Sequence, residues 1–108
     1  MNKLLETRGL DEVLSEFAKA RDWERFHSPK NLAMALSVEA GELVEIFQWL
    51  TEDESKSVMN DAVRNIHVQE ELADVMLYLA RLAAVLGVDL DEAVRSKIAK
   101  NAVKYPAL

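Results

Sequence analysis

Apolar residues recur along this chain at intervals of three, four and seven, the spacing that lines one face of an α-helix. Short polar stretches divide them into four segments. The pattern predicts helices over residues 10–23, 29–50, 58–86 and 89–104, and the third can be interrupted near residues 65–67. The chain is therefore expected to be all-α.

Start and stop signals support these boundaries. Ser28 can cap a helix that begins at Pro29, because proline lacks an N–H that would be unsatisfied there anyway. The polar stretch 51–57 predicts a connection, with a new helix start near Asp53. The remaining boundary signals are Gly87 as a C-cap, Asp89 with Glu92 as a capping box, and Tyr105-Pro106 as the final stop. Short connections favour antiparallel neighbours, so we predict one domain over residues 1–108, an antiparallel bundle of about four to five helices.

Composition narrows the class of protein. Half of the residues are hydrophobic, and three glycines and two prolines favour long helices. The absence of cysteine excludes disulfides and thiolate metal sites. A net charge of −6 argues against a nucleic-acid partner, because a duplex-binding protein usually carries a basic face. Without a signal-peptide core or an apolar run of membrane-spanning length, we expect no membrane partner and a cytoplasmic location.

Two matched pairs of carboxylates intrude on the apolar faces of the long helices. Glu39-x-x-Glu42 lies in the second helical segment, and Glu71-x-x-Asp74 lies in the third. In each pair the first residue falls on the apolar stripe and the second at its edge. Glu45 is expected to point outward, with a role as an auxiliary ligand as the alternative. If the helices are antiparallel neighbours, the pairs can face each other. Four carboxylates that face one another repel strongly, so positive charge must compensate them. Sites built only from oxygen ligands suit hard cations such as Mg²⁺.

Other side chains have both a packing and a binding interpretation. Trp23 and Trp49 can pack at a core edge or stack on a flat ring, since aromatic stacking contributes roughly 1–3 kcal/mol per base. His27 can be a loop residue or a hydrogen-bonding contact to a base. The same two readings hold for the helical residues Tyr78, Lys97 and Asn101, which can be packing or surface residues or can contact a phosphate-bearing ligand.

These motifs resemble the all-α nucleoside triphosphate pyrophosphohydrolases, the MazG-like group, whose signature is E-x-x-E followed after a gap by E-x-x-D. The sequence around these motifs is more specific than the motifs themselves. The stretches RDWERFHSPKNLAMAL, FQW, QEELADVMLYL, GVDL and SKIAKNAVKYP are similar to the small dCTP pyrophosphatase branch of that group. The likeness extends from about Phe17 to Pro106.

The resemblance implies hydrolysis of a nucleoside triphosphate between its α and β phosphates, giving a monophosphate and pyrophosphate. It implies a homodimer or, as favoured in this branch, a dimer-of-dimers tetramer. Mg²⁺, or Mn²⁺ as a substitute, would be held by Glu39, Glu42, Glu71 and Asp74. Trp23, His27 and Trp49 would approach the base, while Tyr78, Lys97, Asn101 and Tyr105 would approach the sugar or phosphates. One departure is Leu14, which stands where some members carry a base-contacting histidine. This departure weakens the implied preference for cytosine but leaves the implied metal chemistry unchanged.

Three interpretations follow from the sequence. The first is a Mg²⁺-dependent pyrophosphohydrolase that clears unwanted deoxynucleotides, with dCTP-like substrates favoured. In it Glu42, or alternatively Glu39, orients the attacking water. The second is a non-catalytic helical module that binds protein partners. The third is a pyrophosphohydrolase for another compound, such as phosphoribosyl-ATP.

Overall fold

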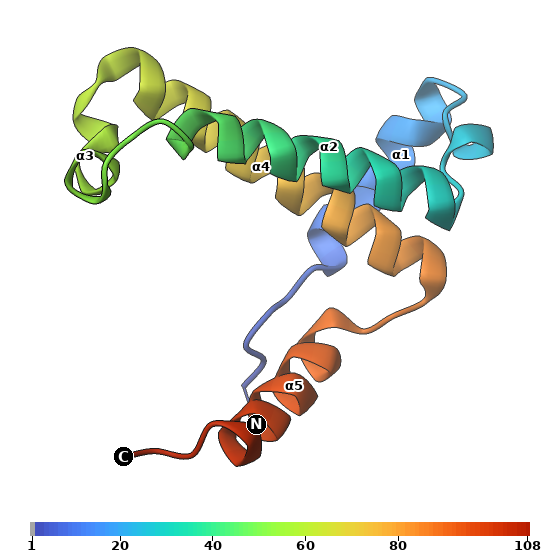
Figure 1. Ribbon diagram of the computed structural model, residues 1–108. Coiled ribbons are helices and arrows are strands. Elements are labelled where there is room, and N and C mark those ends of the chain that lie inside the picture. The colour runs from blue at the N-terminus through green and yellow to red at the C-terminus, as the bar shows by residue number, and fades with distance from the viewer. Residues whose placement is uncertain (1) are drawn as a thin grey trace.

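The computed structural model describes residues 2–108, and over that range it consists of helices without a strand. Five α-helices and two 3₁₀ turns follow one another along the chain (Figure 1). The α-helices are α1 (Arg8–Ala20), α2 (Pro29–Phe47), α3 (Glu52–Lys56), α4 (Ala62–Leu86) and α5 (Leu90–Lys104), and the 3₁₀ turns are Glu24–Phe26 and Val58–Asn60. The all-α prediction is confirmed.

Capping groups set most helix ends where the sequence predicted them. The Ser28 hydroxyl accepts a hydrogen bond from the Asn31 N–H at 3.1 Å, with Pro29 as the first helical residue. Gly87 ends α4 in the left-handed region at φ 71°, which glycine adopts without a Cβ clash. The Asp89 carboxylate accepts from the Glu92 N–H at 3.1 Å and starts α5. These local signals work because each one satisfies backbone groups that a helix end leaves unpaired.

Three predicted boundaries need correction. The first helix covers Arg8–Ala20 and not residues 10–23, because Asp22, at φ 55°, turns the chain and the Trp23 N–H bonds back to the Ala18 carbonyl at 2.9 Å. The interruption of the third segment lies at Asp61, before the expected residues 65–67. The Asp61 carboxylate accepts from the N–H groups of Val63 and Arg64, at 3.0 and 2.9 Å, and so fixes the start of α4. The second helix ends at Phe47 and not at Leu50, and the capping box of Thr51 and Glu54 then begins α3.

The centre of the molecule is the antiparallel pair formed by α2 and α4, which run side by side in Figure 1. Leu32 on α2 is 2% exposed, and Val68 and Ala80 are buried at two separate levels of α4. Helix α1 crosses α4 and buries Ala18. This pair of long helices positions the carboxylates described below, because both E-x-x-[ED] motifs lie within it.

Helix α5 diverges from the α2–α4 pair and is accompanied by the N-terminal segment (Figure 1). The Asp91 carboxylate on α5 holds that segment by accepting the N–H groups of Leu4 and Leu5, at 2.7 and 3.0 Å, and it pairs with Arg95 at 3.0 Å. The radius of gyration is 16.7 Å, against about 13 Å expected for a compact chain of this length. The shape is therefore open. Within residues 2–108, none of the helices has the combination of length and apolar character that crossing a lipid bilayer requires.

Candidate active site

Three of the four predicted carboxylates meet at the centre of the α2–α4 pair. Glu39 and Glu42 come from α2, and Glu71 comes from α4. One carboxylate oxygen of each lies within 4.8 Å of the others. Glu71 is only 7% exposed, while Glu39 and Glu42 are half-buried. The two helices thus bring together oxygen ligands that are far apart in sequence.

The electrostatics of this cluster are unfavourable without a cation. The Oε2 atoms of Glu39 and Glu71 are buried and have no hydrogen-bond partner among residues 2–108. Burial, followed by the neighbouring carboxyl groups of Glu71, Glu42 and Asp74, raises the pKa of Glu39 to about 7. A buried carboxylate with an unpaired oxygen costs free energy, and either a proton or a bound cation offsets that cost. The donor set, all oxygen and rich in charge, fits a hard divalent ion.

Asp74 and His67 flank the cluster on α4. Asp74 is half-buried and close enough to raise the pKa of Glu39, but it lies outside the group of three and lines the adjacent pocket. His67 was missed by the sequence reasoning; its Nε2 lies 3.6 Å from Oε1 of Glu71. The spacing of four residues between His67 and Glu71 on one helix was the signal that could have found it.

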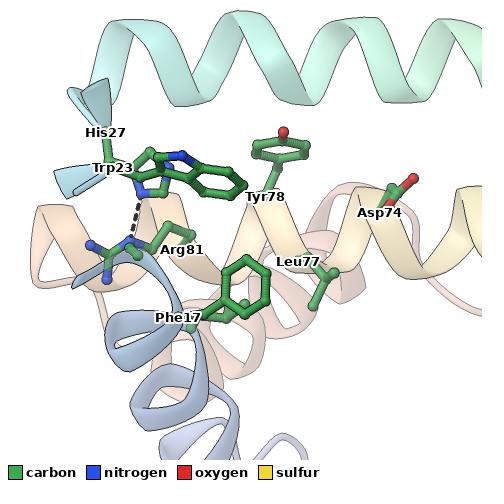
Figure 2. Close-up of a pocket in the computed structure, with 9 residues that line it drawn as sticks. Phe17, Trp23, His27, Asp74, Leu77, Tyr78 and Arg81 are labelled. Atoms are coloured by element: carbon green, nitrogen blue, oxygen red, sulfur yellow. Dashed lines mark hydrogen bonds between the residues drawn. The ribbon is translucent and has the colours of Figure 1, made fainter. Parts of the chain in front are cut away.

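An aromatic pocket of about 170 Å³ adjoins the carboxylates. It lies between α1, α4 and the residues that flank the 3₁₀ turn Glu24–Phe26. Figure 2 shows Trp23 and His27 at one end, Tyr78 in the middle and Asp74 at the other end. Asp74 is the lining residue whose charge acts on Glu39. The rings of Trp23 and Phe17 meet edge-to-face with centroids 5.6 Å apart. The predicted residues Trp23, His27 and Tyr78 are therefore brought to one pocket, and its aromatic walls suit a flat ring.

Arg81 completes the end of this pocket and was also missed by the sequence reasoning. Its Nε–H donates to Nδ1 of His27 at 3.1 Å (Figure 2). Burial, with a smaller contribution from the Arg81 charge, lowers the pKa of His27. The sequence signal was the position of Arg81, three residues after Tyr78 and seven after Asp74 on one helix face.

The other predicted substrate contacts lie elsewhere in a single chain. Trp49 comes just after the C-terminal end of α2, whereas the aromatic pocket lies near the N-terminal end of that helix. The side chain of Trp49 is 87% exposed. The remaining three are exposed residues on or just after the diverging α5 (Figure 1), namely Lys97, Asn101 and Tyr105. One chain therefore forms the carboxylate cluster and one aromatic wall, and it leaves these four residues outside that site.

The sequence from residue 34 to residue 108 matches the model of the MazG-like family. That match includes both carboxylate pairs and Arg81. This chain belongs to the MazG-like family. The family resemblance predicted from the motifs is thus confirmed.

Named relatives add to this assignment of a MazG-like protein. The chain is 50% identical over 93 residues to dCTP pyrophosphatase 1 of Homo sapiens and 48% identical over 92 residues to that of Mus musculus. These matches cover 86% and 85% of this chain but 55% and 54% of the relatives, so the chain spans about half of their length. A crystal structure of a pyrophosphatase from Archaeoglobus fulgidus is similar over 99% of this chain and 98% of its own, with a TM-score of 0.87 and 41% identity.

Proposed function

We propose that this MazG-like protein is a metal-dependent nucleoside triphosphate pyrophosphohydrolase, with dCTP or a dCTP-like deoxynucleotide as its substrate. The products would be the monophosphate and pyrophosphate, and the biological role would be cytoplasmic clearance of unwanted deoxynucleotides. The observation that carries the proposal is the group of three carboxylates within 4.8 Å, two of them with buried unpaired oxygens, beside an aromatic pocket. The similarity to dCTP pyrophosphatases supports cytosine as the nucleobase of the substrate.

Mg²⁺, or Mn²⁺ in its place, would be held by Glu39, Glu42 and Glu71, with Asp74 at the edge of the site. The buried Oε2 atoms of Glu39 and Glu71 fit this role because they have no other partner among residues 2–108. When bound, the ion supplies Lewis-acid stabilisation of charge on the phosphate oxygens. The ligand set contains no nitrogen or sulfur, which is typical of Mg²⁺ sites that bind phosphate substrates.

The chain's own residues would do the remaining chemistry. Glu42 would offer one carboxylate oxygen to the ion, and its other oxygen would orient the attacking water and accept its proton; the buried unpaired oxygens belong to Glu39 and Glu71. Glu39 is the alternative base, since it belongs to the same group of three carboxylates. Tyr78 lines the aromatic pocket between Asp74 and Arg81, where it can contact the sugar.

The other predicted contacts lead us to propose a homo-oligomer, with a tetramer favoured over a dimer. A pocket of about 170 Å³ is smaller than the roughly 300–1,000 Å³ of complete ligand sites, so another segment must supply further walls. Apolar side chains on α2 and α5 are more than half exposed, among them Val38, Val44 and Ile98. A second copy that covers them would bring Trp49, Lys97, Asn101 and Tyr105 to the site of its neighbour.

Subunit complementation tests this shared site. Glu71→Gln and Trp49→Ala each damage every site of a homo-oligomer, but a mixed dimer keeps one site with both native residues. Mixed dimers isolated from co-expression of the two variants should show about half of wild-type turnover at low dCTP, because each mixed dimer has one intact site out of two. Turnover should be measured after purification through two different tags. Mixed oligomers that stay inactive would contradict a site built from two subunits.

Product identification with a substrate panel tests the activity itself. We expect dCTP with Mg²⁺ to yield dCMP and pyrophosphate, with no inorganic phosphate as the primary product. The panel should include the other deoxynucleotides, the ribonucleotides, 5-modified cytosines and phosphoribosyl-ATP, assayed by chromatography with and without EDTA. Hydrolysis of phosphoribosyl-ATP alone would move the assignment to that substrate. Absence of turnover and of Mg²⁺-dependent nucleotide binding would favour the non-catalytic interaction module.

A further inference from the structure

Arg81 and His27 form a polar pair at one end of a pocket whose other lining residues, apart from Asp74 at the opposite end, are aromatic or aliphatic. The Arg81 Nε–H donates to His27 Nδ1 at 3.1 Å, and both side chains line the pocket. Leu14, which lines the same pocket, offers no hydrogen bond. The polar groups at this end of the pocket are the Arg81–His27 pair and the indole N–H of Trp23, and of these only the imidazole of His27 can be either a donor or an acceptor.

The hydrogen bond fixes which nitrogen of the imidazole carries a proton. Arg81 is a donor only, so Nδ1 of His27 must be the acceptor and must be unprotonated. The ring is neutral at ordinary pH, because burial and then the charge of Arg81 lower the pKa of His27, against the opposite effect of Glu24. A neutral ring with an unprotonated Nδ1 carries its hydrogen on Nε2. His27 is thereby held as a hydrogen-bond donor.

The position of the pair relative to the carboxylates suits a base. Asp74, Tyr78 and Arg81 lie four and three residues apart on one face of α4, and Glu71 begins that face. Seven residues of helix separate Asp74 from Arg81, or about 10 Å along the axis. Figure 2 shows the same order along the helix, with Asp74 at one end and Arg81 at the other. A nucleotide with its phosphates at the carboxylates can extend its base towards Arg81.

We propose that Arg81 is a specificity-determining positioning residue, which holds His27 as an Nε2–H donor so that the pocket accepts cytosine and rejects thymine and uracil. This inference rests on the proposed function and names the base that the site selects. Cytosine presents an unprotonated N3 beside its O2 carbonyl, and both accept hydrogen bonds. Thymine and uracil present an N3–H there, which would meet the His27 donor and leave two donors facing each other. Without Arg81, His27 can change tautomer and accept from N3–H.

The test uses Arg81→Met, which keeps an unbranched stem but removes the donor. Arg81→Lys is the conservative variant that can still donate to Nδ1, and Arg64→Met, an exposed change on α4, is the matched control. Binding of dCMP and dTMP is measured by calorimetry, which requires no turnover. The tautomer of His27 is read from its ¹⁵N chemical shifts, and kcat and KM are measured for dCTP and dTTP.

Wild-type protein and Arg64→Met should bind dCMP at least about tenfold more tightly than dTMP. In Arg81→Met the ratio should fall towards one, with His27 in both tautomers and with a rise in KM for dCTP that exceeds any fall in kcat. Arg81→Lys should restore part of the preference. An unchanged ratio in Arg81→Met, a proton on Nδ1 in wild type, or no binding of either monophosphate would overturn the proposal.

The two proposals fail in different ways. If no deoxynucleotide triphosphate releases pyrophosphate, the proposed function is wrong, yet the binding ratio and the His27 tautomer still decide the role of Arg81. If dCTP is hydrolysed but the preference for cytosine survives Arg81→Met, the proposed function stands and the role of Arg81 is refuted.

Discussion

Replacing Glu71 by glutamine is expected to lower turnover by at least roughly 10²–10³-fold, the size of effect seen when one electrostatic stabiliser is removed from an active site. Glu71 is the most buried member of the carboxylate cluster, at 7% exposure, and its Oε2 has no partner among residues 2–108. Glutamine keeps the shape but offers one neutral oxygen to a cation. Asp74→Asn should have a comparable effect. The measurement is pyrophosphate release from dCTP at saturating Mg²⁺.

Glu71→Gln should lower turnover without lowering the stability of the metal-free protein. Removing a buried charge whose Oε2 is unpaired is expected to leave the metal-free protein as stable as wild type or more stable, because the desolvation cost of that charge disappears. Thermal unfolding in EDTA therefore separates a lost metal ligand from a damaged fold. Glu45→Gln is the matched control, since Glu45 is exposed on the same helix as Glu42 and should change neither property. Full turnover in both Glu71→Gln and Asp74→Asn would refute the assignment of the site.

The affinity for Mg²⁺ is expected to weaken by about tenfold for each pH unit below 7, because a proton on Glu39 must then be displaced by the ion. The pKa of Glu39 is raised to about 7 by burial and by the neighbouring carboxyl groups. Saturating Mg²⁺ should accordingly raise the melting temperature more at pH 8 than at pH 6. A free Mg²⁺ concentration of 100 times the dissociation constant would add about 2.7 kcal/mol to the free energy of unfolding. Calorimetric titration at several pH values measures the linkage directly.

The metal-free protein should show the reverse trend with pH. The pKa of Glu39 is higher in the folded state than the ordinary value of 4.5, so between pH 4.5 and about 7 the native state binds a proton that the unfolded state lacks. Its contribution to stability is complete below pH 4.5 and is lost as the pH rises through about 7. The lowered pKa of His27 acts in the opposite direction, so the difference between wild type and Glu39→Gln isolates Glu39. A pH-independent difference would contradict the raised pKa.

Local sequence signals were sufficient for most helix ends but not for all. Ser28, Gly87 and Asp89 each satisfy backbone groups at a helix end, so their effect is readable within a few residues. The interruption at Asp61 was displaced in the prediction because the apolar periodicity continues through it, although one carboxylate there accepts two N–H groups. The spacing of apolar residues shows which face of a helix is buried. It does not show a helix start that interrupts the backbone while the apolar spacing continues.

The sequence by itself determined the all-α fold and the MazG-like carboxylate pairs, and it predicted the first carboxylate of each pair on the apolar face, because helical periodicity converts spacing directly into a shared face. Only the tertiary structure decided which carboxylates meet, since the distances between Glu39, Glu42 and Glu71 depend on how α2 packs on α4. It also decided that Arg81 reaches His27, residues that belong to α4 and to a distant loop. No local pattern specifies a contact between two elements; that contact depends on the packing and crossing of the helices.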